Sequence, residues 1–294
     1  MLGTKEIKRR IKSVISIQQI TRAMQMIAVS RLKKAEDRLR SARPFAEKIQ
    51  EFMGTLAPSL TSIRHPLLVK REVRNIGLVL IASDKGLCGG YNANVLNHAK
   101  QFIEDHSDKA IRLILVGRKA FDAFRRKSFP IDYSVLQISK EISIQEVKEI
   151  SGVVVKGFQE GQYDEVDLIY TRYHSAMNTK PVTLKLLPIE RSEVLKTGGG
   201  LKGEPLFEPE PEEIMSRLLP KYLEAQIYSG LVESVASEQG ARMVSMKSAT
   251  ENAQEMISIL TLTYNKARQA SITKELLEVT SGAEALRYAK QKKR

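Results

Sequence analysis

The chain has 294 residues, of which 42% are apolar, with one cysteine and a formal net charge of +13. This apolar content suffices for a packed core, whereas a single cysteine excludes an intrachain disulfide and fits a reducing compartment. No run of 18 apolar residues occurs, so we expect no membrane-spanning helix. The N-terminus lacks the apolar region of a signal peptide, so we also expect no secretion.

The positive charge is concentrated at the two ends of the chain. Residues 1–57 contain 13 Lys or Arg against 5 Asp or Glu, and residues 266–294 contain 8 against 3, which accounts for the whole net charge. Because the stretch between them is neutral, we expect both ends to contact one negatively charged surface.

Residues 1–57 are predicted to form one coiled-coil helix. Apolar or small residues recur from Ile7 to Leu56 in 14 steps, a mean spacing of 3.5 residues, which is typical of a coiled-coil seam. Pro44 should bend this helix and Pro58 should end it. The predicted seam comprises Ile7, Ile11, Val14, Ile17, Ile20, Met24, Ala28, Leu32, Ala35, Leu39, Ala42, Ala46, Ile49, Met53 and Leu56.

A second long helix is predicted over residues 212–286, followed by a basic tail at 287–294. Prolines and acidic residues at 208–213 are typical of a helix start, and Ser281-Gly282 of a helix stop. Bends are expected at Pro220, Gly230 and Gly240. The predicted seam comprises Ile214, Leu218, Tyr222, Ala225, Tyr228, Val232, Val235, Met243, Met246, Ala249, Ala253, Met256, Leu260, Tyr264, Ala267 and Ala270.

Neither helix can bury its apolar stripe alone, so the simplest arrangement is an antiparallel pair. From the helix rise, we expect the numbers of paired residues to sum to about 270. The last 15 to 20 helical residues, roughly, would then extend beyond the partner helix.

The middle of the chain, residues 75–190, reads as alternating strands and helices, which predicts a Rossmann-like α/β domain with a mostly parallel sheet. Strands are expected at 75–82, 111–116, 131–136, 166–173 and 182–189, and helices at 91–106, 119–126 and 143–159. Residues 191–211, which include Thr197-Gly198-Gly199-Gly200, are the expected linker to the last helix.

The turn at residues 83–90, Ser-Asp-Lys-Gly-Leu-Cys-Gly-Gly, follows a strand and precedes a helix. This is the context of a phosphate-binding loop, but the spacing fits neither GxGxxG nor GxxxxGK[ST]. A tight turn that needs positive φ angles is the better interpretation. We expect Cys88 to be a small buried side chain rather than a nucleophile. The acidic cluster of Asp164, Glu165 and Asp167 is better explained as a loop or cap than as an acid/base pair.

The segment from Tyr264 to Val279 has apolar residues on more than one face, including Ile272, Leu276, Leu277 and Val279. A single helix of this kind frays in water, so it needs a surrounding partner. Two other function classes remain open. The basic runs at 8–12 and 31–34 could bind nucleic acid, and the middle domain could carry an enzyme, although no nucleotide-binding motif is complete.

Three blocks of sequence give the chain a resemblance to the gamma subunits of F-type ATP synthases, and the resemblance extends over nearly its full length. The first block includes residues 8–11, 19–26 and 31–32, and the second is residues 83–92. The third runs from Ala236 to Met243 and continues through Asn252-Ala253 to residues 268–275. The order and spacing of the three blocks make the resemblance specific.

The resemblance implies a non-catalytic rotor shaft without cofactor or metal. Its partners would be alpha and beta subunits around the terminal helices, and an epsilon subunit and the membrane c-ring at the α/β domain. By similarity, Arg268, Gln269 and Thr273 would contact loops of the surrounding subunits, Met24 and Arg242 would lie in the collar region, and Gly86, Gly89 and Gly90 would belong to the foot. A bacterial protein, peripheral on the cytoplasmic side of the cell membrane, is expected.

Overall fold

The computed structural model describes residues 4–56, 65–138, 142–189 and 211–291. The chain forms two compact units, one of residues 1–26 with 246–294 and the other of residues 27–245. Two long helices, α1 (Thr4–Leu56) and α6 (Pro211–Gln291), each contribute to both units. Within the described residues, no helix is both long and apolar enough to cross a bilayer.

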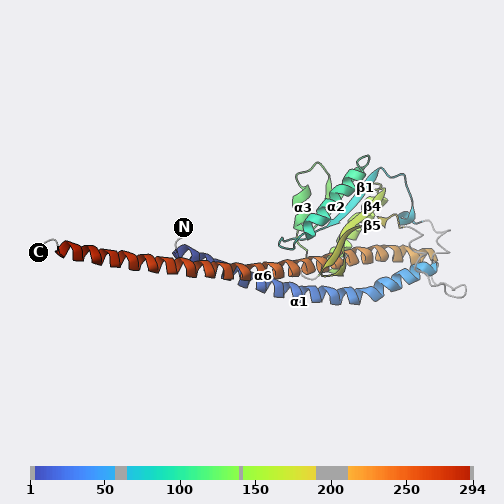
Figure 1. The fold of residues 1–294 in the computed structure, drawn as a ribbon. Coiled ribbons are helices and arrows are strands. Elements are labelled where there is room, and N and C mark those ends of the chain that lie inside the picture. Colours follow the sequence, from blue (N-terminus) through green and yellow to red (C-terminus); the bar gives the residue numbers. More distant parts are fainter. Residues whose placement is uncertain (1–3, 57–64, 139–141, 190–210, 292–294) are drawn as a thin grey trace. The chain divides into compact units, whose positions relative to one another are not determined.

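The second unit contains a five-stranded sheet in the order β3-β2-β1-β4-β5 (Figure 1). Its strands are β1 (Asn75–Ile81), β2 (Ala110–Val116), β3 (Ile131–Val135), β4 (Glu165–Ser175) and β5 (Asn178–Leu187). The first four strands pair in parallel, and β5 pairs with β4 in antiparallel orientation. The expected, mostly parallel sheet is therefore confirmed. The central strands β1 and β2 read as nearly continuous apolar runs because both faces of the sheet are covered.

Two layers of helix cover the sheet. Helices α2 (Tyr91–Asp105) and α3 (Arg118–Phe124) bury Val95, Ala99 and Phe124 against one face. Helix α4 (Ile144–Gln159), the short 3₁₀ helix η2 (Pro66–Leu68) and the first part of α6 contribute to the core on the other face. This gives a three-layer α/β domain whose core includes η2 and a segment of α6, both outside the predicted range of 75–190.

The first part of α6 differs from the expectation that it pairs with α1 alone. Met215, Leu219, Leu223, Ile227 and Leu231 are buried in the same core as strands β1 and β4. A separate small cluster joins α6 to α1, through Ala236 with Leu32 and Ala35. Between Met215 and Ala236, helix α6 therefore has two apolar faces. One face packs against the sheet, and the other packs against α1.

The expected helix stop at Ser281-Gly282 is wrong, since α6 continues to Gln291 and so passes the predicted boundary at 286. Gly282 is not among the residues with positive φ, so it does not adopt the conformation of a glycine cap. One glycine costs a helix only about 1 kcal/mol, which is not enough to end it.

Helices α1 and α6 continue without a break through Pro44, Pro220, Gly230 and Gly240. Gly230 and Gly240 serve close packing instead. A Cβ atom at Gly230 would lie 2.9 Å from Leu168, and one at Gly240 would lie 3.0 Å from the backbone of Ala176. The predicted stop at Pro58, residues 191–210 of the predicted linker, and residues 292–294 of the predicted tail lie outside the described residues.

Candidate functional site: partner-binding surfaces

In the first unit, α1 and α6 form an antiparallel pair whose register agrees with the predicted sum of about 270. Gln18 donates a hydrogen bond of 2.7 Å to Gln254, and the hydroxyl oxygens of Thr21 and Thr250 are 2.8 Å apart, so the residue numbers sum to 272 and 271. Polar side chains therefore link the two helices at two consecutive positions, partly buried at Thr21–Thr250 and more exposed at Gln18–Gln254.

The predicted seam is wrong in this unit at four positions, since Ile17, Ile20, Met256 and Ala270 are exposed. Ile17, Ile20 and Met256 are 50%, 59% and 52% exposed, while their neighbours Gln18, Thr21 and Ile257 are partly buried. The strict apolar spacing selected Ile17 and Ile20, but the helices turn these side chains outward and place polar side chains between them. The consequence is an apolar outer surface. Its members on α1 are Ile15, Ile17, Ile20 and Met26, and on α6 Met256, Ile259 and Leu262.

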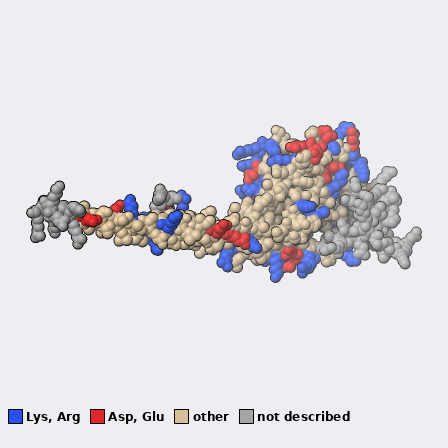
Figure 2. Space-filling model, viewed as in Figure 1, with Lys and Arg blue, Asp and Glu red and all other residues tan. Residues whose placement is uncertain are grey.

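The described end of α6 is a single helix. Ala267 is its last partly buried residue, and every side chain described from Arg268 to Ala285 is exposed. Ile272, Leu276, Leu277 and Val279 are among them, although they are apolar. Of the predicted contact residues, Arg268, Gln269 and Thr273 lie on this segment. On the face drawn in Figure 2, uncharged side chains cover most of the long helical part that is not grey.

The glycine-rich turn is a tight turn, as predicted. Leu87 and Gly89 have φ angles of 61° and 56°, and Leu87 is well exposed while Cys88 is buried. Burial raises the pKa of the Cys88 thiol, which makes it a poor nucleophile. Gly86 has open surroundings, and a Cβ atom at Gly90 would meet the side chain of Asn94 at 3.3 Å. Gly86, Leu87, Gly89 and Gly90 are all exposed, so this turn presents backbone and the Leu87 side chain at the surface.

Arg242 is the one predicted contact residue whose side chain is nearly covered. It forms an ion pair of 2.6 Å with Glu238 and donates hydrogen bonds to the carbonyl oxygens of Gly86 at 3.2 Å and Lys85 at 3.5 Å. The structure thus brings together Arg242 and the glycine-rich turn, both selected from the sequence. Met24, in the other unit, is partly buried.

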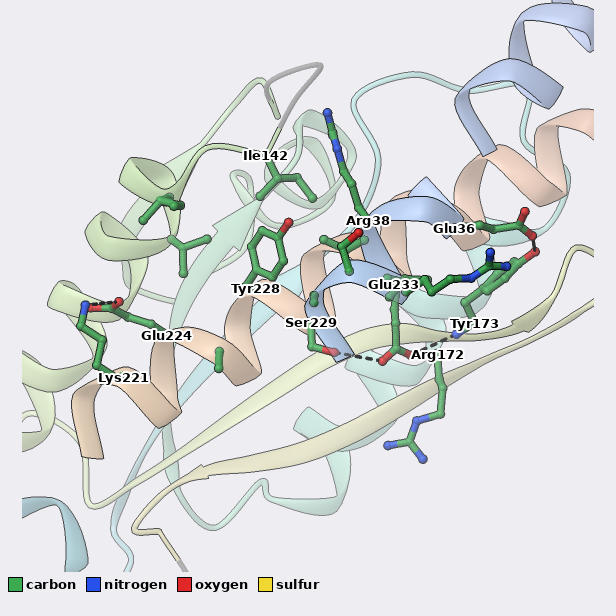
Figure 3. A pocket seen from close by; sticks show the side chains of 18 of the residues that line it. Glu36, Arg38, Ile142, Arg172, Tyr173, Lys221, Glu224, Tyr228, Ser229 and Glu233 are labelled. Atoms are coloured by element: carbon green, nitrogen blue, oxygen red, sulfur yellow. Dashed lines mark hydrogen bonds and ion pairs between the residues drawn. The ribbon is translucent and has the colours of Figure 1, made fainter. Parts of the chain in front are cut away.

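Sequence reasoning missed a groove of about 1350 Å³ in the second unit, lined by α1, the start of α4, the end of β4 and α6 (Figure 3). Its carboxylates already have partners. Glu224 pairs with Lys221 at 2.7 Å, Glu36 accepts a 2.6 Å hydrogen bond from Tyr173, and Glu233 accepts one of 3.3 Å from Ser229. Because its lining comes from four separate elements, no local motif could reveal it. No arrangement of nucleophile, base and orienting group is present among its described residues.

The acidic cluster at the start of β4 is a cap, as predicted. Asp164 accepts hydrogen bonds from the backbone N–H groups of Arg74 and Asn75 at 3.0 and 2.9 Å. Glu165 pairs with Lys185 at 2.7 Å. Burial and the neighbouring Glu165 raise the pKa of Asp167 to about 7.

Known proteins resemble this chain over nearly its full length. A family model described as ATP synthase matches residues 3–286. The chain is 46% identical over 291 residues to the ATP synthase gamma chain of Heliobacterium modesticaldum, covering 97% of this chain and 100% of the relative. It is 42% identical over 286 residues to that of Desulforamulus reducens, covering 97% and 100%.

Solved structures give the same result. The chain resembles a chain in the central stalk and c-ring structure of the Tetrahymena thermophila mitochondrial ATP synthase, with a TM-score of 0.60, 28% identity, and coverage of 78% of this chain and 99% of that one. A chain of the Euglena gracilis mitochondrial ATP synthase gives a TM-score of 0.64 at 17% identity, with coverage of 98% and 95%, which supports the fold.

Proposed function

This chain belongs to the family of ATP synthase gamma chains, and we propose that it is the central rotor shaft of an F-type ATP synthase. In this role it carries torque between the ion-driven c-ring in the membrane and the catalytic hexamer of alpha and beta subunits. It is itself non-catalytic. Of the three function classes that the sequence left open, family membership favours the rotor over the nucleic-acid-binding protein and the enzyme.

The observation that carries the proposal is the exposed end of α6. Leu276, Leu277 and Val279 are 61%, 61% and 70% exposed, on a stretch of helix that no other described residue of the chain covers. Burying a Leu side chain is worth about 1.5–3 kcal/mol, so a protein that leaves several of them exposed together has an occupant for them. A ring of alpha and beta subunits around the helix supplies that cover.

The apolar outer surface of the helix pair extends the same argument. Ile17, Ile20, Met256 and Leu262 face outward, while the polar pair Thr21–Thr250 lies between the helices and Gln18–Gln254 bridges them at the exposed edge. An isolated coiled coil with this pattern would gain stability if the two sets were exchanged. The pattern suits a shaft whose outside is gripped by other subunits.

The contact residues follow from this arrangement. Arg268, Gln269 and Thr273, on the exposed end of α6, contact loops of the surrounding ring, and Met24 contributes to a collar. The turn at Gly86, Gly89 and Gly90 belongs to the foot, and Arg242 acts on that surface through the turn that it binds. The α/β domain faces an epsilon subunit and the c-ring. The protein is peripheral to the bacterial cell membrane, on its cytoplasmic side.

Co-assembly tests the proposal. The purified chain should have no ATPase activity, and mixing it with alpha and beta subunits should give a stable complex with strong ATPase activity. A parallel titration with duplex DNA at low and high salt tests the nucleic-acid alternative, since phosphate contacts give steep salt dependence. The rotor proposal is wrong if the chain fails to co-purify with the alpha and beta subunits.

A further inference from the structure

The strand order of the α/β domain defines a place where domains of this type bind ligands. Strand β1 is followed by β2 on one side, and β4 lies on the other side of β1. The order in which successive strands are added to the sheet therefore reverses between the parallel strands β1 and β4. The crevice at the carboxyl ends of strands at such a switch point is the usual ligand site of an open α/β sheet. In this protein the glycine-rich turn and the start of α2 lie at the end of β1.

Side chains of α6 bind the backbone of β4 where the strand approaches this crevice. Ser237 donates a hydrogen bond of 3.1 Å to the carbonyl oxygen of Thr171, and Ser234 accepts one of 3.4 Å from its N–H. Two residues further along β4, the N–H of Tyr173 donates a hydrogen bond of 3.2 Å to Glu233. Ser234 and Ser237 are completely buried or nearly so.

The next turn of α6 binds the loop after β1. Arg242 donates to the carbonyl oxygens of Gly86 and Lys85, and Glu238 holds Arg242 by an ion pair of 2.6 Å. The side chains of Arg242 and Glu238 are only 9% and 12% exposed. Charge-assisted hydrogen bonds in so buried a place are among the strong ones. We call Glu238, Arg242 and the two carbonyl oxygens the clasp.

The turn is also tied to the sheet on its other side. Asp84 accepts hydrogen bonds from the backbone N–H groups of Arg118 and Ile138, at 3.2 and 3.0 Å. Ser83 bonds the side chain of Asn92 at 2.9 Å. The turn therefore connects α6 to the ends of β2 and β3, and a force on α6 at Arg242 reaches the sheet through polar contacts of 3.0–3.5 Å, partly buried at Arg242 and exposed at Arg118.

We propose that the clasp is the built-in occupant of the crevice at the carboxyl ends of β1 and β4, and that it transmits torque between α6 and the α/β domain. Arg242 is in this view a positioning residue that fixes the turn after β1 against α6, in addition to the apolar core that already joins α6 to the sheet. The inference rests on the proposed rotor function. It goes beyond that function by naming the joint at which rotation of one part is passed to the other.

The clasp itself can be tested on the full chain by amide hydrogen exchange. Arg242→Gln removes the charge and the ion pair, and exchange of the amides at residues 84–90 should rise about tenfold because a charge-assisted hydrogen bond is lost. The matched control is Arg217→Gln. Arg217 forms the same type of i,i+4 ion pair on the same helix, with Glu213 at 2.8 Å, but on the surface. Unchanged exchange in Arg242→Gln would show that the turn does not depend on the clasp.

Torque transmission needs a second readout, measured in the assembled ATP synthase in membrane vesicles. Arg242→Gln should lower the number of ions pumped per ATP hydrolysed, while Arg217→Gln should leave it unchanged. A covalent link should then restore coupling. A Cβ atom at Gly89 would lie 2.7 Å from the hydroxyl oxygen of Ser245, so the pair Gly89→Cys and Ser245→Cys can join the turn to α6 by a disulfide. Gly89 has a φ of 56°, so Gly89→Cys also strains the turn, and the same cysteine pair with Arg242 intact is the control for that strain.

All variants carry Cys88→Ala, so that the introduced thiols have no other partner in the chain. In the Arg242→Gln background, oxidation of the two cysteines should restore coupling and reduction should abolish it again. If coupling returns only in the oxidised form, the result supports the clasp. The alternative is that Arg242 acts by contacting another subunit directly, and a disulfide within the chain could not replace such a contact. Full coupling in Arg242→Gln, or no gain on oxidation, overturns it. If even the parent protein does not assemble, the proposed function itself fails.

Discussion

Gln18 of α1 donates a 2.7 Å hydrogen bond to Gln254 of α6, although 236 positions separate the two residues in the chain. The neighbouring pair, Thr21 and Thr250, repeats the contact with hydroxyl groups 2.8 Å apart. Polar pairs inside a helix seam specify register at some cost in stability. These two layers fix which residues of the terminal helices face each other.

A disulfide at the second layer tests this register. In a Cys88→Ala background, Thr21→Cys with Thr250→Cys should form a bond rapidly on mild oxidation, because the oxygen atoms that the sulfurs replace lie 2.8 Å apart. The control pair, Ile20→Cys with Thr250→Cys, should stay reduced, since Ile20 is 59% exposed. Gel mobility under non-reducing conditions measures both. Equal bonding in the two pairs would contradict the assigned seam.

Gly157 and Gly152 lie on the same helix in opposite situations. A Cβ atom at Gly157 would meet the ring of Tyr163 at 2.2 Å, while one at Gly152 meets nothing within 4 Å. Gly157→Ala should therefore lower the free energy of unfolding by roughly 1–3 kcal/mol, and Gly152→Ala should raise it by up to about 1 kcal/mol. Chemical denaturation of each variant measures the change. The packing of Tyr163 is misassigned if both substitutions act in the same direction.

Asp167 should make the stability of the α/β domain fall as pH rises. Burial raises its pKa in the folded state to about 7, from 3.8, so between these values the folded state binds more protons than the unfolded state. The free energy of unfolding then decreases with rising pH across this window. Asp167→Asn should reduce the loss of unfolding free energy between pH 5 and pH 8 by on the order of 2 kcal/mol. Denaturation at pH 5 and pH 8 would detect it, and an unchanged slope would argue against a protonated Asp167.

The exposed end of α6 should matter for assembly and not for folding. Leu276→Gln together with Leu277→Gln removes apolar groups that are 61% exposed each. The thermal unfolding temperature of the chain should stay unchanged, whereas its affinity for the alpha and beta subunits should fall at least about tenfold. Glu275→Gln, on the same exposed helix, is the control and should leave assembly intact. Equal affinity of all three proteins would contradict the role given to this surface.

The sequence predicted the alternating α/β order and the antiparallel register well because both follow from local patterns and a constant helix rise. It failed where two patterns compete on one helix. Ile17 and Ile20 fit the apolar spacing but face outward, and the proposed rotor function assigns them to contact with other subunits. The run from Met215 to Leu231 fits a coiled coil yet packs on the sheet, and a single sequence does not say which of two apolar faces meets which partner.

For the candidate sites as well, the sequence predicted some residues, but only the fold shows which of them lie together. Arg242 and the glycine-rich turn were selected separately from the family resemblance, and only the fold shows that they bind each other. The groove beside Glu233 gave no signal at all, since its lining residues are spread over more than 190 positions from Glu36 to Glu233.

Rotation is the central claim, and a single-molecule experiment tests it most directly. Lys127 is exposed on the α/β domain, so Lys127→Cys in the Cys88→Ala background offers a place for a bead, with the alpha and beta subunits fixed to glass. We expect ATP to drive the bead in one direction, and oxidation of an engineered disulfide between α6 and a beta subunit to stop it. A bead that stays still while ATP is hydrolysed would contradict the account.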